Sequence, residues 1–570
     1  MRKIFFFKYN ILFLIPLIGF LLYFQSLSNG FVLDDNIQLT ENLAVHSLKN
    51  IPLLFLGGSF GGSTTLQGIY YKPLMSTVFT LLYAFFGASP MPFHLFQLIV
   101  HIINSLLVYF LLRKFFKNNL SLLLSLIFLV HPINSETVLY ISALQDQLFT
   151  LFGLSALLVA TKKVLGYKDY FLFAFLILLS LLSKEAGVLY LLISVVFRFI
   201  FYKKDFIKFF LLSILTFSPY LALRIFSVGL ASPKSQAFFI MRIGFWQRIE
   251  NVPAIILYYL KTMVFPKDLA VSQNWLIHAR NFQDFYMPTF IILIILLALF
   301  ATMTFSRSKI FIFFSIWFLL GVFLHSNLLV ALDGTVSDRW MYFPIIGFLA
   351  LAGTILQRVK KERLLAILII ILVIVLSIRT FIRSLDWKSD FSISSHDVYI
   401  TKDNFALENT LGSALIQQGQ YKEAIPYLEQ STRLAPYHWI NWNNLGVAYL
   451  NMGFKSGNKD DLNKAEKYLN KAIENGQEYY LPYENMGLLV VDFRDPNQAV
   501  NFFQTSSKKI SLNHRLWFLL AIAQYKLGDK EKAMEAAKQA YYLNPDDSTS
   551  TQLYYALFNH QNINIAGPQL

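Results

Sequence analysis

The segment ILFLIPLIGFLLYF, residues 11–24, has no charged side chain and is typical of a helix that enters the hydrocarbon core of a bilayer. Arg2, Lys3 and Lys8 precede it, which is also the charge order of a signal peptide. The apolar stretch is long for a signal peptide, however, and the SLSNG that follows is a weak cleavage site. We therefore expect an uncleaved first membrane helix.

Similar apolar stretches recur along the first two thirds of the chain. The composition agrees, because 55% of the residues are hydrophobic and the mean hydropathy is +0.49, above the average of soluble proteins. About eleven transmembrane helices are expected, beginning near Ile11, His94, Leu120, Leu148, Tyr170, Val188, Phe206, Thr289, Ile310, Phe343 and Leu364.

The connections between these stretches differ in charge. Five of them are short and basic, at residues 113–119, 161–169, 198–208, 307–309 and 357–363. Lys and Arg are retained on the cytoplasmic face, so a cytoplasmic N-terminus places all five inside. An odd number of spans then puts everything after Arg383 outside. We expect a bacterial inner-membrane protein with a periplasmic C-terminal part.

The net charge of +15 belongs to the membrane half, because residues 391–570 hold 16 Lys and Arg against 18 Asp and Glu. No basic surface on a soluble domain remains for nucleic acid, so we expect no nucleic-acid partner. Cysteine is absent, which excludes disulfides and thiolate metal sites.

The C-terminal part contains an internal repeat. In ALENTLGSALIQQGQYKEAIPYLEQSTRLAP, residues 406–436, small and apolar residues stand where a tetratricopeptide unit packs its two helices. Positions equivalent to Gly412 recur at Gly446, Gly487 and Ala521, at spacings of 34, 41 and 34 residues, the longer one with a seven-residue insertion near 455–462. The pattern predicts four helix-turn-helix units in an α-solenoid. We expect a membrane domain over residues 1–390 and a repeat domain over 391–570.

Charged residues stand in short motifs beside the outer ends of the apolar stretches. Adjacent carboxylates can act as a general base with an electrostatic partner, or as cation ligands. The motifs are FVLDDN with Asp34 and Asp35, YYKPL with Lys72, HPINSE with His131 and Glu136, the later Asp146, LSKEAG with Lys184 and Glu185, and SDRWMYFP with Asp338 and Arg339.

Each motif alone also has a structural interpretation. The two aspartates can mark a solvated helix end, Lys184 and Glu185 can form a helix-end ion pair, and Trp340 with Tyr342 can anchor at the interface. The expected topology brings all of them to one membrane face. That convergence favours a functional site.

Together these motifs resemble the transmembrane and tetratricopeptide-repeat O-mannosyltransferases, glycosyltransferases of the GT-C fold that use polyprenyl-phosphate sugars. The resemblance covers nearly the whole chain and includes the helix FHLFQLIVHIIN, residues 93–104, and the trailing repeats. Two positions depart from the family. It usually has an Arg-Ala-Asp-like triplet where this chain has residues 144–146, and a Glu-Arg-Tyr-like one where it has 338–340.

The resemblance implies an inverting transfer of a mannose-like sugar from a lipid-linked donor to a hydroxyl of a protein or glycan. An outer-loop carboxylate would activate that hydroxyl, with Asp35 as the base and Asp34 as its partner. Arg339, Lys72 and Lys184 would neutralise the donor phosphate. Supporting positions are His131, Glu136, Asp146, Glu185 and Asp338, and a divalent cation could bind only through the aspartate pair.

Two other functions compete with this interpretation. A non-catalytic membrane scaffold could use the repeats to recruit envelope proteins, but it does not need charges at several helix ends. A transporter or lipid-linked-oligosaccharide ligase is the third alternative. Transporters commonly show internal duplication, and the membrane half of this sequence shows none.

Overall fold

The computed structural model describes residues 5–58, 70–229, 238–277, 280–401 and 403–561. Arg2 and Lys3, used above for the topology, lie outside these residues. The described chain is helical, and its only β-type pairing is an isolated bridge between Gln273 and Val336. It forms two compact units, Met1–Lys402 and Asp403–Leu570.

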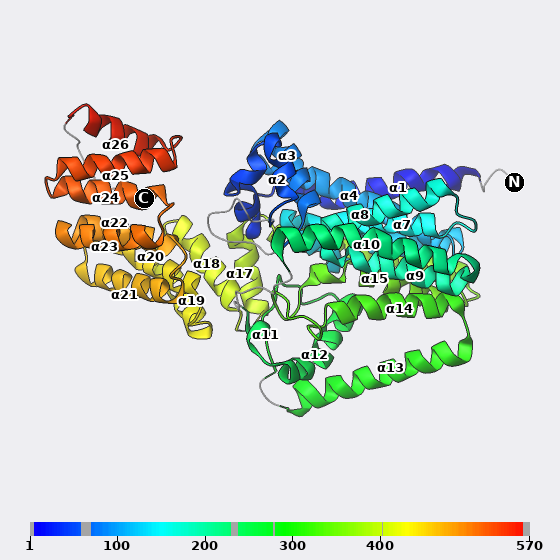
Figure 1. Cartoon of the computed structure of the whole chain (residues 1–570). Coiled ribbons are helices and arrows are strands. Elements are labelled where there is room, and N and C mark those ends of the chain that lie inside the picture. The colour runs from blue at the N-terminus through cyan, green and yellow to red at the C-terminus, as the bar shows by residue number, and fades with distance from the viewer. Residues whose placement is uncertain (1–4, 59–69, 230–237, 278–279, 402, 562–570) are drawn as a thin grey trace. The chain divides into compact units, whose positions relative to one another are not determined.

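The first unit contains seventeen α-helices in its described part, and Figure 1 shows the long ones running side by side. They are α1 Phe5–Tyr23, α2 Ile51–Leu54, α3 Pro73–Phe86, α4 Pro90–Leu112, α5 Asn118–Val130, α6 Ser135–Leu139, α7 Leu144–Ala160, α8 Tyr167–Ser183, α9 Val188–Phe201, α10 Phe206–Val228, α11 Phe239–Arg242, α12 Phe245–Val264, α13 Met287–Ser306, α14 Lys309–Leu324, α15 Pro344–Leu356, α16 Glu362–Asp386 and α17 Asp390–Ile400.

An apolar helix stands at each of the eleven expected starts. Five segments are long and apolar enough to cross a membrane alone, namely Pro90–Leu112, Ile141–Ala160, Lys203–Val228, Phe282–Phe305 and Glu362–Asp386. A sixth candidate is Asn118–Val130 with Pro132–Leu139, which are bent by 48° at their junction. The number of spans therefore stays a prediction, while the apolar all-helical architecture is confirmed.

Large apolar side chains cover the outside of this unit. On α13, Leu297 and Phe300 are 66% and 69% exposed, and α16 has a similar surface. Inside, Trp317 stacks on Phe343 and Tyr190 meets both rings edge-on. An exposed apolar belt around a packed interior is the arrangement expected of helices that face lipid.

Two expected boundaries differ from the structure. The segment between the first expected span and the one that begins near His94 contains α3, a fourteen-residue apolar helix that is not among the expected spans. The division between the units falls after α17 rather than before it. The reason is that Asp390 of α17 accepts a hydrogen bond from the Leu33 backbone at 2.6 Å, and Asp397 forms an ion pair with Arg383 of α16.

The second unit is a stack of helix pairs, as the repeat predicts (Figure 1). The pairs are α18 Phe405–Gln417 with α19 Tyr421–Leu434, α20 Trp439–Ser456 with α21 Lys459–Asn475, α22 Leu481–Phe493 with α23 Pro496–Lys509, and α24 His514–Lys526 with α25 Lys530–Leu543, followed by α26 Ser548–Phe558.

The repeat glycines lie where paired helices approach most closely. A methyl group on Gly412, Gly446 or Gly487 would press against Leu428, Leu469 or Phe503 of the paired helix. The seven-residue insertion lengthens α20 and α21 to 18 and 17 residues instead of forming a loop. The four-unit solenoid is thus confirmed, with a longer second unit.

Candidate active site

A cavity of about 530 Å³ opens in the first unit where the motif-bearing loops and helix ends meet. Its lining is mixed in charge, with three carboxylates and four cations beside aromatic and aliphatic groups. The lining residues are Asp34, Gln38, Tyr70, Tyr71, Lys72, Tyr140, Ser142, Gln145, Lys184, Glu185, Ala186, Val188, Arg224, Leu324, His325, Leu329, Val330, Ala331, Leu332, Asp333, Arg339 and Trp340. Five of the ten expected site residues are among them.

The two adjacent aspartates have different surroundings. Asp35 is fully buried, and its carboxylate accepts hydrogen bonds from the Ser142 backbone (2.7 Å), the Ser142 hydroxyl (2.6 Å) and the Val32 backbone (3.1 Å). Burial raises the pKa of Asp35 to about 7, against the effect of these hydrogen bonds. Asp34 is the member of the pair that lines the cavity.

The backbone before the cavity is fixed from three sides. Leu33 has a φ of +53°, a conformation that is unfavourable for a branched side chain, and its N–H donates to Asp390. The Asp34 N–H donates to the Tyr140 hydroxyl at 3.2 Å. Together with the hydrogen bonds of Asp35, these contacts hold Asp34 at the cavity wall.

Arg339 is placed by Glu136. The Glu136 carboxylate accepts from the Arg339 backbone (3.0 Å) and the Ser337 hydroxyl (2.8 Å), and lies 3.3 Å from the Arg339 guanidinium. The guanidinium also sits over the Tyr140 ring, 5.5 Å from its centroid. Its Nε is buried without a hydrogen-bond partner in the described chain. Because Arg339 lines the cavity, its guanidinium is placed to meet an anionic ligand there.

Two further ion pairs frame the cavity. Lys184 donates to Asp146, whose carboxylate is buried behind it. Arg224, near the end of α10, donates to Glu185 at 2.8 Å. In both pairs the cation lines the cavity, and a negative partner fixes its place.

Lys72 stands at the start of α3, with its ammonium 4.5 Å from the centroid of the Tyr70 ring. Burial, together with the nearby charges of Lys184 and Arg339, lowers the pKa of Lys72 to about 7. The cavity thus contains a cation whose charge can change near neutral pH.

Five expected site residues stand behind the cavity wall or away from it. Asp35, Glu136 and Asp146 hold the loop or the cations described above. His131 is buried, and its ring hydrogen-bonds the Met263 carbonyl (3.0 Å) and accepts from the Ile133 backbone. Asp338 accepts from the Tyr258 hydroxyl at 3.1 Å, and burial raises its pKa. These contacts indicate supporting positions.

Arg224, Asp333 and Tyr140 line the cavity but were not among the expected residues. Arg224 had a readable signal, because an arginine inside the apolar segment 206–228 is costly and needs a reason. Asp333 and Tyr140 stand in no motif that marks them.

The fit of a metal ion depends on Asp34 alone, since the oxygens of Asp35 already accept three protein hydrogen bonds. Among the described residues there is no group of three or more His, Asp or Glu side chains that could hold a metal ion.

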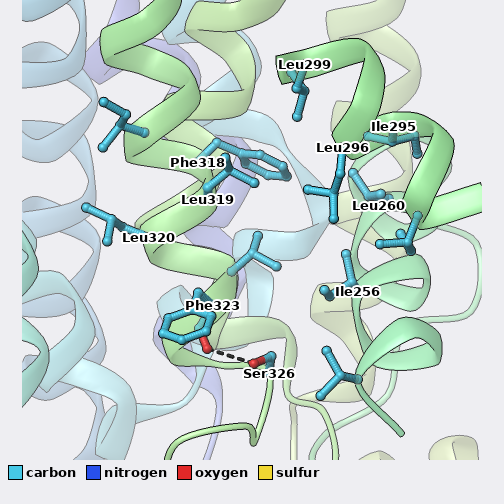
Figure 2. A pocket seen from close by; sticks show the side chains of 14 residues that line it. Ile256, Leu260, Ile295, Leu296, Leu299, Phe318, Leu319, Leu320, Phe323 and Ser326 are labelled. Atoms are coloured by element: carbon cyan, nitrogen blue, oxygen red, sulfur yellow. Dashed lines mark hydrogen bonds between the residues drawn. The ribbon is translucent and has the colours of Figure 1, made fainter. Parts of the chain in front are cut away.

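A second, almost wholly apolar cavity of about 410 Å³ lies between α12, α13 and α14. Figure 2 shows Ile256 and Leu260 of α12, Leu296 of α13 and Phe318 of α14 among its lining side chains. Ser326 is its polar end, and its hydroxyl donates to the Phe323 carbonyl at 2.7 Å. Apolar chains rather than hydroxylated groups suit such a lining.

Comparison with known proteins identifies the repeats in the second unit. Models described as tetratricopeptide repeat match residues 409–438 and 514–547. Among solved structures, MamA from Desulfovibrio magneticus RS-1 is 18% identical, with a TM-score of 0.24 over 28% of this chain and 86% of its own. ArnT from Cupriavidus metallidurans, bound to undecaprenyl phosphate, is 13% identical over 87% of this chain and 80% of its own, with a TM-score of 0.39.

Among curated proteins, human protein O-mannosyl-transferase TMTC3 is 23% identical over 92% of this chain and 67% of its own length. Protein O-mannosyl-transferase F38B6.6 of Caenorhabditis elegans and mouse TMTC3 are each 24% identical over 75% of this chain. The chain spans 63% and 52% of those two relatives, so it matches between half and two thirds of their lengths. In sequence the chain is thus similar to protein O-mannosyl-transferases over most of its length, and two segments of its second unit match tetratricopeptide-repeat models.

Proposed function

We propose that the chain is a membrane glycosyltransferase that moves a mannose-like sugar from a polyprenyl-phosphate donor to a hydroxyl of a protein or glycan. The observation that carries this proposal is that Asp34, Arg339, Lys72 and Lys184 line the same cavity. A base and several cations in one enclosed space suit a reaction that removes a proton and releases a phosphate. The relatives' name agrees with this choice of reaction.

In the proposed step Asp34, which lines the cavity, accepts the proton of the acceptor hydroxyl. It takes the place of Asp35, the base expected from the sequence, whose carboxylate is buried. The resulting oxygen attacks the anomeric carbon from the face opposite the phosphate, so the new bond forms with inversion. The bond between the anomeric carbon and the phosphate oxygen breaks, and its electron pair leaves on the polyprenyl phosphate. Arg339, Lys184 and Lys72 stabilise that developing charge, which is worth most in an enclosed site.

Apolar residues around the cavity support the proposal that the donor carries a lipid chain. Leu329 and Val330 line it, and they are 59% and 53% exposed. The apolar cavity between α12, α13 and α14 is suited to part of a hydrocarbon chain. We place the charged cavity on the outer face of the membrane, as the basic connections predict.

The repeats are proposed to bind the acceptor or a protein partner. Stacked repeats present an extended surface, and such surfaces serve protein recognition in many solenoids. Their match to tetratricopeptide-repeat models supports this role.

The test is to incubate the purified full chain with radiolabelled polyprenyl-phosphate sugars and a hydroxyl-bearing peptide acceptor. We expect sugar to appear on the acceptor and polyprenyl phosphate to be released. Neither transfer nor donor hydrolysis with any such donor would contradict the proposal and favour a membrane-anchored repeat scaffold.

Donor binding should depend on pH through Lys72. Because its pKa is about 7, Lys72 is largely protonated below that pH and loses its charge above it, while the donor phosphate stays anionic. The donor KM should therefore rise between pH 7 and pH 9, by up to about tenfold per unit. KM measured for Lys72→Met should be higher and flat over that interval. A wild-type profile that is equally flat would remove Lys72 from the phosphate site.

A further inference from the structure

The loop of residues 327–336 is clamped into one shape at the cavity. Asn327, at a φ of +59°, donates from its side chain to the Thr335 carbonyl at 2.9 Å and accepts from the Leu332 backbone at 2.7 Å. The Ser272 hydroxyl donates to the Asp333 carbonyl at 3.3 Å. The Gln273–Val336 bridge fixes the end of the loop. A loop held at both ends places its side chains in defined positions.

Asp333 lines the cavity, and among the described residues its carboxylate has no hydrogen-bond or ion-pair partner. It lines the same space as Asp34 and Arg339, and its side chain is half-buried. Within the described residues the structure gives this carboxylate no hydrogen bond and no ion pair, in contrast to Glu136 and Asp146. Burial raises the pKa of Asp333 to about 6, with Arg339 lowering it and Asp34 raising it, so the group is ionised at neutral pH.

The same short loop changes character along its length. Leu329 and Val330 give it an apolar, exposed part, and Asp333 follows three residues later with a charge. Such a loop matches a ligand that is hydrocarbon at one end and hydroxylated at the other. A carboxylate accepts hydrogen bonds only, from as many as two neighbouring hydroxyls at once.

We propose that Asp333 binds hydroxyls of the sugar being transferred, and so helps to select the sugar. The inference rests on the proposed function, since it names the part of the donor that this carboxylate contacts. Asp34 and Arg339 then act on the acceptor proton and the phosphate, while Asp333 holds the ring between them. A sugar without the contacted hydroxyl leaves the carboxylate facing the cavity unpaired, which costs affinity.

The experiment compares donors that differ by one oxygen. Release of polyprenyl phosphate is measured for the full chain with polyprenyl-phosphate mannose and with its 2-, 3-, 4- and 6-deoxy forms. At least one deoxy form should raise the wild-type KM by about 10- to 100-fold, the range of hydrogen bonds to a charged group. Asp333→Ala should raise the KM of intact mannose by a similar factor and add no penalty for that deoxy form.

Two variants serve as references. Asp333→Asn should give a smaller loss, because its amide oxygen still accepts one hydroxyl. Asp268→Ala removes an exposed carboxylate that pairs with Lys261 at 3.6 Å outside the cavity, and it should show the wild-type pattern. Thermal unfolding of each variant checks that the fold is kept.

The outcomes separate the two proposals. If the wild type turns over no polyprenyl-phosphate sugar, the proposed function fails and this inference fails with it. If the wild type is active but Asp333→Ala keeps the same deoxy penalties, only the inference fails. A loss confined to kcat would also overturn it, since that pattern marks a group acting in the transition state rather than in sugar binding.

Discussion

Replacing Asp34 with Asn is expected to lower kcat by about 10²- to 10⁴-fold, the usual contribution of a positioned general base. The donor KM should change little, because the phosphate contacts are made by other residues. Asn keeps the size of the side chain but cannot take a proton. The measurement is steady-state transfer from a polyprenyl-phosphate sugar, with donor concentration varied at saturating acceptor.

Asp35→Asn serves as the comparison for this variant. Asp35 is buried under three donated hydrogen bonds, so its loss should act on the loop that carries Asp34. We expect a lower melting temperature and a moderate loss of activity. If instead Asp35→Asn abolishes turnover in a protein of unchanged stability while Asp34→Asn stays active, the base is Asp35 and the assignment made here is wrong.

Asp34 and Asp35 also show where sequence reasoning ends. The FVLDDN motif predicts a functional carboxylate at this position, with Asp35 as the base, whereas the hydrogen bonds of Asp35 favour Asp34 in that role. Which aspartate faces the cavity depends on the hydrogen bond from Ser142, 107 positions from Asp35, and on the left-handed backbone conformation of Leu33. Sequence spacing contains neither fact.

The fold was more readable than the site. Gly412, Gly446 and Gly487 recur at a repeat period because each must let a paired helix approach, so their spacing predicts the solenoid directly. The apolar stretches likewise predict helices by composition alone. The limits of α3 and α17 could not be predicted, because α17 is fixed to the first unit by distant contacts such as Arg383 with Asp397.

The cavity itself could be predicted only in part. Residues such as Lys72, Lys184 and Arg339 stand in motifs at expected helix ends, and topology alone gathers them on one face. Asp333 belongs to no motif, and only the closure of its loop by Asn327 brings it to the cavity. The roles of all these residues stay predictions until the variants are measured.

Arg339→Ala is expected to raise the donor KM by about 10- to 100-fold, the value of losing a charge-assisted hydrogen bond to phosphate. Arg339 lines the cavity and 17% of its side chain is exposed, so its guanidinium can meet an anion there. Arg339→Lys should recover only part of the affinity, since an ammonium keeps the charge but loses the planar fork. Donor KM and kcat for both variants provide the measurement.

Glu136 supplies the control that separates binding from folding. Its carboxylate holds Ser337 and both the backbone and the guanidinium of Arg339, across 203 positions of sequence. Removing a buried partner of this kind leaves a charge uncompensated and costs about 3–5 kcal/mol. Glu136→Ala should therefore lower the melting temperature sharply. Arg339→Ala should lower it less, because the Glu136 carboxylate keeps its hydrogen bonds from the Ser337 hydroxyl and the residue-339 backbone, while losing more donor affinity. A reversed order of the two effects would assign Arg339 to the fold instead of the donor, and the phosphate would then have to be held by Lys72 and Lys184.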